Sequence, residues 1–387
     1  MSMLASFVTY KVSNILHSRF GIDPQFPYYS NPNYHYKTIS EINAQDNLFI
    51  DETPIREDRI APKYPIILCH GFSGFDRLFL IPSLNRLKYM VTHKELDVDS
   101  LQEQPESGLY FEYWNGIQKA LIANGSVVMI AKVAPMGSIE VRAGMLNEFI
   151  NKQIARLSKH QKIKDKLHSQ QRIDEVNLQN DGPSPKIKVN LVAHSMGGLD
   201  CRYLISKINE SQKNYEVVSL TTISTPHRGS EVADYVTDLM RSSELFTNSD
   251  FFRSLNDLRL SLVPSSIYQL TTRKMKEFNK EVENDRNVKY FSYGARFFPS
   301  WNNIYRFTWQ IVKDASGGID NDGLISINSA KWGKYMGTIE DADHLDLINW
   351  RNPIRRFWRE TIRHRKSGFD AIHFYLNIAD DLAKEGL

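Results

Sequence analysis

Short apolar runs of strand length alternate with longer stretches of helical spacing over most of this 387-residue chain. The clearest run, from Tyr64 to Cys69, is continuous, and a similar run leads from Ile187 into Ser195. Continuous apolar runs of this length are typical of strands that are buried on both faces. Strands are predicted at 64–69, 126–131, 187–194, 217–224 and 289–293.

Helical spacing fills the intervals between these strands. Apolar residues recur every three or four positions in 110–124 and 138–154, and Gly125 is placed to end the first of these helices. Another amphipathic helix is predicted at the C-terminal end, over 369–376 and 379–387. This alternation favours a parallel sheet that is covered by helices on both faces, so the predicted fold class is α/β.

The segment 231–286 departs from the alternation because it is helical in pattern throughout and contains no strand. Its first half is rich in Leu, Met and Phe. A movable lid over an apolar site requires such residues, although an ordinary packed helical subdomain would explain them equally well. We favour the lid.

The rest of the chain divides into an N-terminal extension, 1–62, and one folded domain, 63–387. Residues 21–62 are rich in Pro, Asn, Tyr and Asp without clear periodicity, which indicates an extended lead-in on the domain surface. Residues 1–20 are basic, contain several serines and lack acidic residues, a composition typical of organelle transit peptides. An ordinary N-terminal helix has nearly the same composition.

Composition and charge exclude several classes of protein. Apolar residues make up 41% of the chain, but no apolar run approaches the length of about 18 residues that spans a membrane. The net charge of +3 is too small to predict nucleic-acid binding. Basic residues gather at 152–172 and 351–366; solvated helix faces usually look like this, and attraction to an anionic membrane surface is the alternative. Cys69 and Cys201 are predicted to be buried free thiols, which suits a reducing compartment.

The run that ends at Ser195 predicts the chemistry. Ser195 stands between a strand and a helical pattern, with the small residues Ala193 and Gly197 two positions away on either side. A strand, sharp turn and helix of this kind form a nucleophile elbow, which exposes a serine hydroxyl above the carboxyl end of a central strand. Glycine is usual at both flanking positions, so Ala193 is a departure. A chance serine between small residues is the alternative interpretation.

A nucleophilic serine needs a histidine to take its proton and a carboxylate to orient that histidine. On this architecture the partners follow in the order serine, acid, histidine. His344 is the best candidate for the base because it lies in a polar loop before a short helix. The other histidines after Ser195 are His227, His364 and His373.

The acid is predicted at Asp322, just before an apolar run, and the neighbouring Asp320 is its main competitor. The remaining candidates, Asp314, Asp341 and Asp343, are expected to be solvated.

Two backbone N–H groups must receive the negative oxygen of the tetrahedral intermediate. One is expected from Met196, directly after the serine. The other is expected from Phe72, in the His-Gly loop that follows the first strong strand.

Several motifs occur together and in a fixed order. They are the strand and His-Gly loop at 64–74, Tyr-Trp-Asn-Gly-Ile at 113–117, the elbow at 189–203, Thr-Pro-His-Arg-Gly-Ser within 221–233, Asn-Asp-Gly within 321–325 and His-Leu-Asp at 344–346. This combination resembles the true bacterial triacylglycerol lipases, and their fungal mitochondrial relatives more closely still. The similarity covers about 64–350.

The resemblance implies an α/β-hydrolase fold and assigns a role to each candidate residue. It implies Ser195 as nucleophile, Asp322 as acid and His344 as base, with the N–H groups of Phe72 and Met196 as oxyanion donors. Asp322 is favoured over Asp320 because the family's acid lies in the Asn-Asp-Gly turn.

Two features of the bacterial members have no counterpart in this sequence. Many of them bind a structural calcium, and Asp346 matches one ligand position, but 294–313 contains no Asp or Glu and Trp350 replaces a polar ligand. We therefore predict that there is no metal and no cofactor. The bacterial disulfide is also missing, and the resemblance does not explain 77–108 or the basic run at 152–172.

Together, these inferences predict a serine ester hydrolase that cleaves long-chain acylglycerols, above all triacylglycerol, through a Ser-Asp-His triad and an acyl-enzyme. The expected partners are the lipid substrate and, by peripheral contact, a membrane or lipid-droplet surface, with no nucleic acid. The expected location is intracellular and mitochondrial. A phospholipase or other acyl-ester hydrolase is one alternative, and a catalytically silent scaffold that binds lipid or protein is another.

Overall fold

The computed structural model describes residues 49–50, 58–72, 77–79, 110–169, 186–242, 264–301, 303–350 and 369–387. The predicted transit segment, the middle of the predicted lid, the basic run at 351–366 with His364, and most of 77–108 lie outside these residues.

A seven-stranded sheet forms the centre of the described structure. Its strands follow the order β1-β9-β8-β7-β6-β2-β5, and every neighbouring pair is parallel. Helices rather than hairpins must therefore connect the strands, as the alternating pattern predicts. The strands are β1 (Phe49–Ile50), β2 (Ile66–Cys69), β5 (Val128–Ile130), β6 (Ile187–His194), β7 (Tyr215–Ile223), β8 (Lys289–Ala295) and β9 (Lys334–Ile339).

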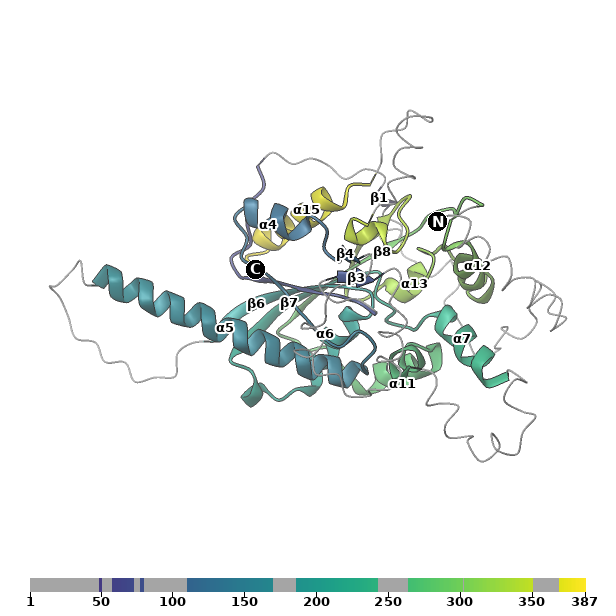
Figure 1. Ribbon diagram of the computed structural model, residues 1–387, viewed down its shortest axis with the longest axis horizontal. Coiled ribbons are helices and arrows are strands. Elements are labelled where there is room, and N and C mark those ends of the chain that lie inside the picture. Colours follow the sequence, from purple (N-terminus) through teal and green to yellow (C-terminus); the bar gives the residue numbers. More distant parts are fainter. Residues whose placement is uncertain are drawn as a thin grey trace.

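Helices cover both faces of the sheet (Figure 1). On one face, α4 (Ile117–Ala123) and α15 (Ala371–Lys384) share an apolar cluster with strand residues such as Val192. On the other face, α5 (Ile139–Ser169) and α6 (Gly197–Lys207) share a second cluster with Leu191. The two-residue period of a strand explains why adjacent residues of β6 belong to opposite clusters.

Several elements differ from the sequence prediction. The helix predicted over 110–124 is wrong in its first half, because β4 (Tyr110–Glu112) pairs antiparallel with β3 (Arg77–Phe79) and the helix begins only at Ile117. Trp114 keeps its predicted place in the core from the turn between β4 and α4, where it is 2% exposed. Strand β9 was not predicted at all, since its first three residues are not buried and give no continuous apolar run.

The described part of the predicted lid region is mostly helical and contains no strand. It contains α7 (Glu231–Ser242), α10 (Ser265–Gln269) and α11 (Thr272–Glu281). Residues 243–263, between α7 and α10, lie outside the described part, so the lid itself stays a prediction. The remaining elements are α12 (Arg306–Ala315), α13 (Ile327–Ala330) and the short 3₁₀ helices η3 (Glu210–Gln212) and η5 (Asp346–Ile348).

Two further sequence predictions can be compared directly with the described residues. Cys69 and Cys201 are both buried free thiols, which confirms the prediction for them. No helix in the described ranges is long and apolar enough to cross a membrane.

Candidate active site

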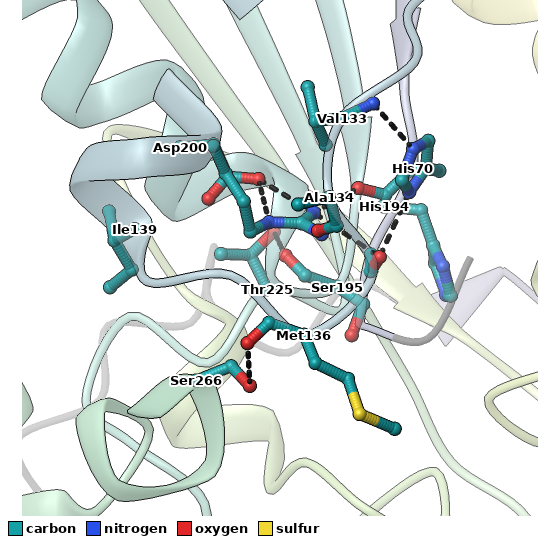
Figure 2. Close-up of polar contacts among 12 residues, drawn as sticks. His70, Val133, Ala134, Met136, Ile139, His194, Ser195, Asp200, Thr225 and Ser266 are labelled. Atoms are coloured by element: carbon teal, nitrogen blue, oxygen red, sulfur yellow. Dashed lines mark hydrogen bonds and ion pairs between the residues drawn. The ribbon is translucent and has the colours of Figure 1, made fainter. Parts of the chain in front are cut away.

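Ser195 occupies the sharp turn between β6 and α6 in a left-handed backbone conformation, with φ of 56°. Such a conformation is strained for a residue with a Cβ and is kept where the surroundings enforce it. The Ser195 N–H donates to the carbonyl of Ile223 at 3.0 Å. Its carbonyl accepts the Thr225 hydroxyl at 2.7 Å, from the loop after β7 (Figure 2). The neighbouring strand β7 therefore fixes the turn from both sides.

Gly197 shows why small residues are needed beside this turn. A Cβ at Gly197 would lie 2.6 Å from the carbonyl oxygens of Cys69 and His70, closer than real side chains approach backbone. Ala193, on the strand side, is fully buried in the cluster beneath α5 and α6, which accommodates its methyl group.

Asp322 and His344 form a direct pair. The His344 Nδ1 lies 2.7 Å from the Asp322 Oδ2, and both side chains are buried. The other carboxylate oxygen accepts the N–H groups of Leu324 and Ile325 at 3.0 and 2.8 Å, and the His344 N–H donates to the Asp322 carbonyl at 2.9 Å. Backbone donors thus hold the carboxylate so that it faces one ring nitrogen of His344.

The His344 ring also lies against the nucleophile elbow. Its centroid is 4.5 Å from the ring centroid of His194, the residue directly before Ser195. Three segments that are far apart in the sequence, ending at Ser195, Asp322 and His344, therefore meet at the carboxyl end of the sheet.

The competing carboxylates are engaged elsewhere. Asp320 forms an ion pair with Arg296 at 2.6 Å, and Asp314 and Asp341 are exposed. The expectation that Asp343 is solvated is wrong. It is only 6% exposed, because its carboxylate accepts the N–H groups of Leu345 and Asp346 that follow it in a tight turn.

The other described histidines after the serine are also engaged away from the site. His227 is buried, bonded to the Thr222 hydroxyl at 3.0 Å and stacked on Trp332. Burial, with Arg202 and Arg228 nearby, holds the pKa of His227 well below its usual range. His373, expected to pack inside its helix, is partly exposed and lies 3.4 Å from Asp370, which caps that helix.

Phe72 and Met196 are brought together beside the serine. Gly71 lies so close that a Cβ there would stand 2.6 Å from the Ser195 Cβ. Phe72, which follows, packs against the buried cluster that contains Met196 and Leu199. Met196 directly precedes the first residue of α6, where helix N–H groups have no partner within the helix.

A buried arginine supports the loop that carries Phe72, and the sequence analysis did not single it out. Arg142 donates to the carbonyls of His70, Gly71 and Ala134 at 2.9, 3.2 and 2.6 Å. It also forms an ion pair with Asp200 of α6 at 2.8 Å, with both side chains almost completely buried. Burial raises the pKa of Asp200 to about 6, against the opposing effect of Arg142.

One sequence signal could have revealed this arginine. Arg142 stands three residues after Ile139 and four before Leu146, so it lies on the buried face of α5. A charged residue at such a position must have buried partners.

Tyr113 forms a second connection, between the same loop and the elbow. Its hydroxyl oxygen accepts the Gly71 N–H at 2.9 Å, and it is hydrogen-bonded to the His194 Nδ1 at 2.7 Å. Burial, with the charge of His344 as a further cause, holds the pKa of His194 well below its usual range. The His194 ring is therefore neutral.

His70 has a comparable structural role. Its Nδ1 donates to the Gly71 carbonyl at 3.0 Å and its Nε2 accepts the Val133 N–H at 3.3 Å, the contact drawn in Figure 2. Burial, assisted by Arg142, lowers the pKa of His70 to about 3. A neutral imidazole matches one donated and one accepted hydrogen bond.

Within the described ranges, no group of three His, Cys, Asp or Glu side chains is arranged to hold a metal ion. Asp346, the residue at a calcium-ligand position of the bacterial lipases, accepts the Asp343 N–H at 3.2 Å. The absence of calcium stays a prediction.

Comparison with known proteins establishes the family. Triacylglycerol lipase 2 of Saccharomyces cerevisiae is 42% identical over 358 residues, which cover 89% of this chain and 98% of the yeast protein. The chain belongs to the triacylglycerol lipase family. A triacylglycerol lipase of Pseudarthrobacter phenanthrenivorans is 26% identical to this lipase over 75% of the chain and 89% of its own length.

Two other comparisons agree with this assignment. A family model described as putative serine esterase (DUF676) matches residues 161–246 of the lipase, which include the elbow. The crystal structure of a metagenomic carboxyl esterase matches with a TM-score of 0.50 and 13% identity, over 86% of this chain and 79% of that one. The lipase has the α/β-hydrolase fold and is a carboxylic ester hydrolase that acts on lipid.

Proposed function

We propose that Ser195, Asp322 and His344 form the catalytic triad of a lipase that cleaves long-chain acylglycerols, with triacylglycerol as the main substrate. The observation that carries this proposal is the hydrogen bond between Asp322 and His344, because the ring of that histidine lies against His194, the residue directly before Ser195. The sequence identity with the yeast triacylglycerol lipase supports the substrate class.

In the proposed reaction, the Ser195 Oγ attacks the ester carbonyl carbon while His344 takes the hydroxyl proton. The N–H groups of Phe72 and Met196 receive the negative oxygen. His344 then gives its proton to the leaving glyceride oxygen, and the acyl group stays on Ser195. Water attacks this acyl-enzyme, transfers a proton through His344 to the serine and releases the fatty acid. Asp322 holds the tautomer of His344 in which Nδ1 carries the proton.

A Ser195→Ala variant tests the triad. We expect its turnover of emulsified triacylglycerol to fall by at least about 10³-fold, and the serine-directed fluorophosphonate probe to label the wild type but not the variant. Ser158→Ala, on α5, is the matched control and should keep full activity. Wild-type turnover by Ser195→Ala would refute the proposal, and an unlabelled, inactive wild type would favour a silent scaffold.

The substrate class and the peripheral contact with a membrane or lipid-droplet surface need separate measurements. We expect faster release of fatty acid from triacylglycerol droplets than from phosphatidylcholine vesicles. The reverse order would identify a phospholipase that uses the same triad.

A further inference from the structure

The loop between β8 and α12 exposes an unusual amount of apolar surface. Trp301 is 80% exposed, Phe298 65% and Ile304 54%. Seven large hydrophobic side chains of the described chain are exposed, and three of them belong to this loop. Tryptophan and phenylalanine are usually mostly buried, and a gathered apolar patch marks an interaction site.

The backbone of this loop forms two tight turns beside these side chains. The Asn303 N–H donates to the Ser300 carbonyl at 3.0 Å, and the Arg306 N–H donates to the Asn303 carbonyl at 3.1 Å. Each bond joins residues three apart, so the two bonds close turns at 300–303 and 303–306. Phe298, Trp301 and Ile304 lie within a stretch of seven residues, and we call these three exposed side chains the aromatic face.

The base of the loop is anchored in the core. Phe297 is 3% exposed, and its carbonyl accepts the Trp309 indole N–H at 2.9 Å. The Tyr305 N–H donates to the Asn303 side chain at 2.7 Å. The aromatic face is therefore held outward by its surroundings, and its exposure is a built feature of the protein.

The loop lies directly against the proposed catalytic acid. The Phe297 N–H donates to the Asn321 carbonyl at 3.3 Å. A Cβ at Gly323, the residue after Asp322, would stand 2.7 Å from the Tyr305 Cβ. Phe307 of α12 also contacts Tyr235 of α7, the first helix of the predicted lid region. A surface that binds the aromatic face would therefore lie close to the active site.

The charges near the loop show which partner fits. Residues 294–313 contain no Asp or Glu. Of their three basic groups, Arg296 is paired with Asp320 and Glu340, and Lys313 lies 3.5 Å from Asp320. The third, Arg306, is exposed at the start of α12. Beside its three apolar side chains this stretch therefore offers a single exposed cation and no anion, and large rings with a polar edge favour the boundary between lipid and water.

We propose that the aromatic face inserts into the interfacial layer of an electrically neutral lipid surface and docks the active site on it. This proposal names the surface-binding element of the lipase proposed above. It differs from attraction through the basic runs, because apolar insertion into neutral lipid is insensitive to salt.

Vesicle binding tests the proposal without using catalysis. In a Ser195→Ala background, we expect the added pair Phe298→Ser and Trp301→Ser to weaken co-sedimentation with phosphatidylcholine vesicles at least tenfold, at low and high salt alike. The control pair Ile122→Ser and Val127→Ser alters side chains that are each 51% exposed elsewhere and should bind normally. Unchanged vesicle binding by the loop pair, or equal loss by the control pair, would overturn the proposal, and the first result would point to a protein partner.

Two further measurements separate insertion from damage to the fold and from failure of the triad. With the active serine restored, the loop pair should hydrolyse a short soluble ester at the wild-type rate. In the Ser195→Ala background, the Trp301→Phe variant should still bind vesicles. Brominated phosphatidylcholine should quench its remaining tryptophan fluorescence less than it quenches the fluorescence of the background protein. Quenching equal to that of the background protein would mean that Trp301 stays in water and would contradict insertion. These binding measurements retain their meaning whether or not Ser195 is the nucleophile.

Discussion

At the scale of single residues, the Tyr113 hydroxyl connects the loop that carries Phe72 to the nucleophile elbow. It accepts the N–H of Gly71 and is hydrogen-bonded to His194, and these groups are buried. Removing this oxygen leaves a buried N–H without a partner, which costs about 1–3 kcal/mol. It also frees the loop to move relative to Ser195.

Tyr113→Phe is therefore expected to lower kcat for a short soluble ester about tenfold with little change in KM, because positioning of the oxyanion donors acts on the transition state. Unfolding in urea should show a loss of about 1–3 kcal/mol. Tyr375→Phe is the matched control, since its buried hydroxyl has no hydrogen-bond partner among the described atoms. Equal effects of the two changes on kcat would contradict a positioning role for Tyr113.

The residues of the proposed triad were predictable from sequence because each follows a recognisable local pattern. Ser195 follows a strand and stands between small residues, and Asp322 lies in a glycine turn. Arg142 and His194 were missed, because their roles depend on partners that are distant in the sequence. The error at Asp343 has a different origin, since its two N–H donors, Leu345 and Asp346, are local and belong to a short turn that the sequence analysis did not predict.

At the scale of elements, the first residue of α7 touches the turn that holds the proposed acid. The Glu231 carboxylate lies 3.4 Å from the Ser326 hydroxyl and is 4% exposed, and its second oxygen has no partner among the described atoms. Burial raises the pKa of Glu231 from 4.5 to about 7. The folded protein therefore holds a proton on this group that the unfolded chain releases at a lower pH.

This shift predicts a dependence of stability on pH. The stabilising contribution of Glu231 to the free energy of unfolding is fully present below about pH 4.5. It is lost as the pH rises to about 7, because the raised pKa favours the protonated form of this side chain in the folded protein. Each unit of pKa difference corresponds to about 1.4 kcal/mol. Glu231→Gln cannot ionise, so we expect its free energy of unfolding to gain a few kcal/mol over the wild type between about pH 5 and pH 8.

Urea unfolding across this range measures the difference. Glu148→Gln, at an exposed position of α5, should follow the wild-type curve. Parallel curves for the Glu231 variant and the wild type would show that this carboxyl is ionised in the folded protein at all these pH values.

The elements themselves were predicted where burial is complete on both faces. Strands β6 and β7 are rich in apolar and β-branched residues, are almost entirely buried and occupy central places in the sheet. Strand β9 begins with the exposed Lys334 and contains Gly337, so pairing with β8 rather than its own composition makes it a strand. The sequence analysis missed β4 for the same reason. Its partner β3 ends at Phe79, thirty-one positions before β4 begins at Tyr110.

At the scale of the whole molecule, the alternation of strands and helices along the chain predicted a sheet covered by helices on both faces. The order of serine, acid and histidine along the chain is the order expected for that architecture. Periodicity does not report which strands become neighbours, because the order of the sheet depends on packing between distant segments. The aromatic face illustrates this limit. The sequence shows that aromatic residues are crowded near Trp301, and the fold adds which of the apolar side chains there are exposed.

The way the acid and base loops are joined leads to a last prediction, which concerns bound calcium. Arg296, at the end of β8, contacts Asp320 before the acid turn and Glu340 after β9, each at 2.6 Å. Protein groups therefore connect the segments on either side of the proposed acid and base. We expect dialysis against EDTA to leave the melting temperature and the turnover of a short soluble ester unchanged.

Arg296→Gln provides the comparison, because it removes the ion pairs and should lower the melting temperature equally with and without EDTA. Scanning calorimetry before dialysis, after dialysis and after addition of calcium measures both effects. A melting temperature that falls on dialysis and recovers with calcium but not with magnesium would show that a calcium site exists in this lipase. In that case, the carboxylate ligands would have to come from outside 294–313, since that stretch contains no Asp or Glu.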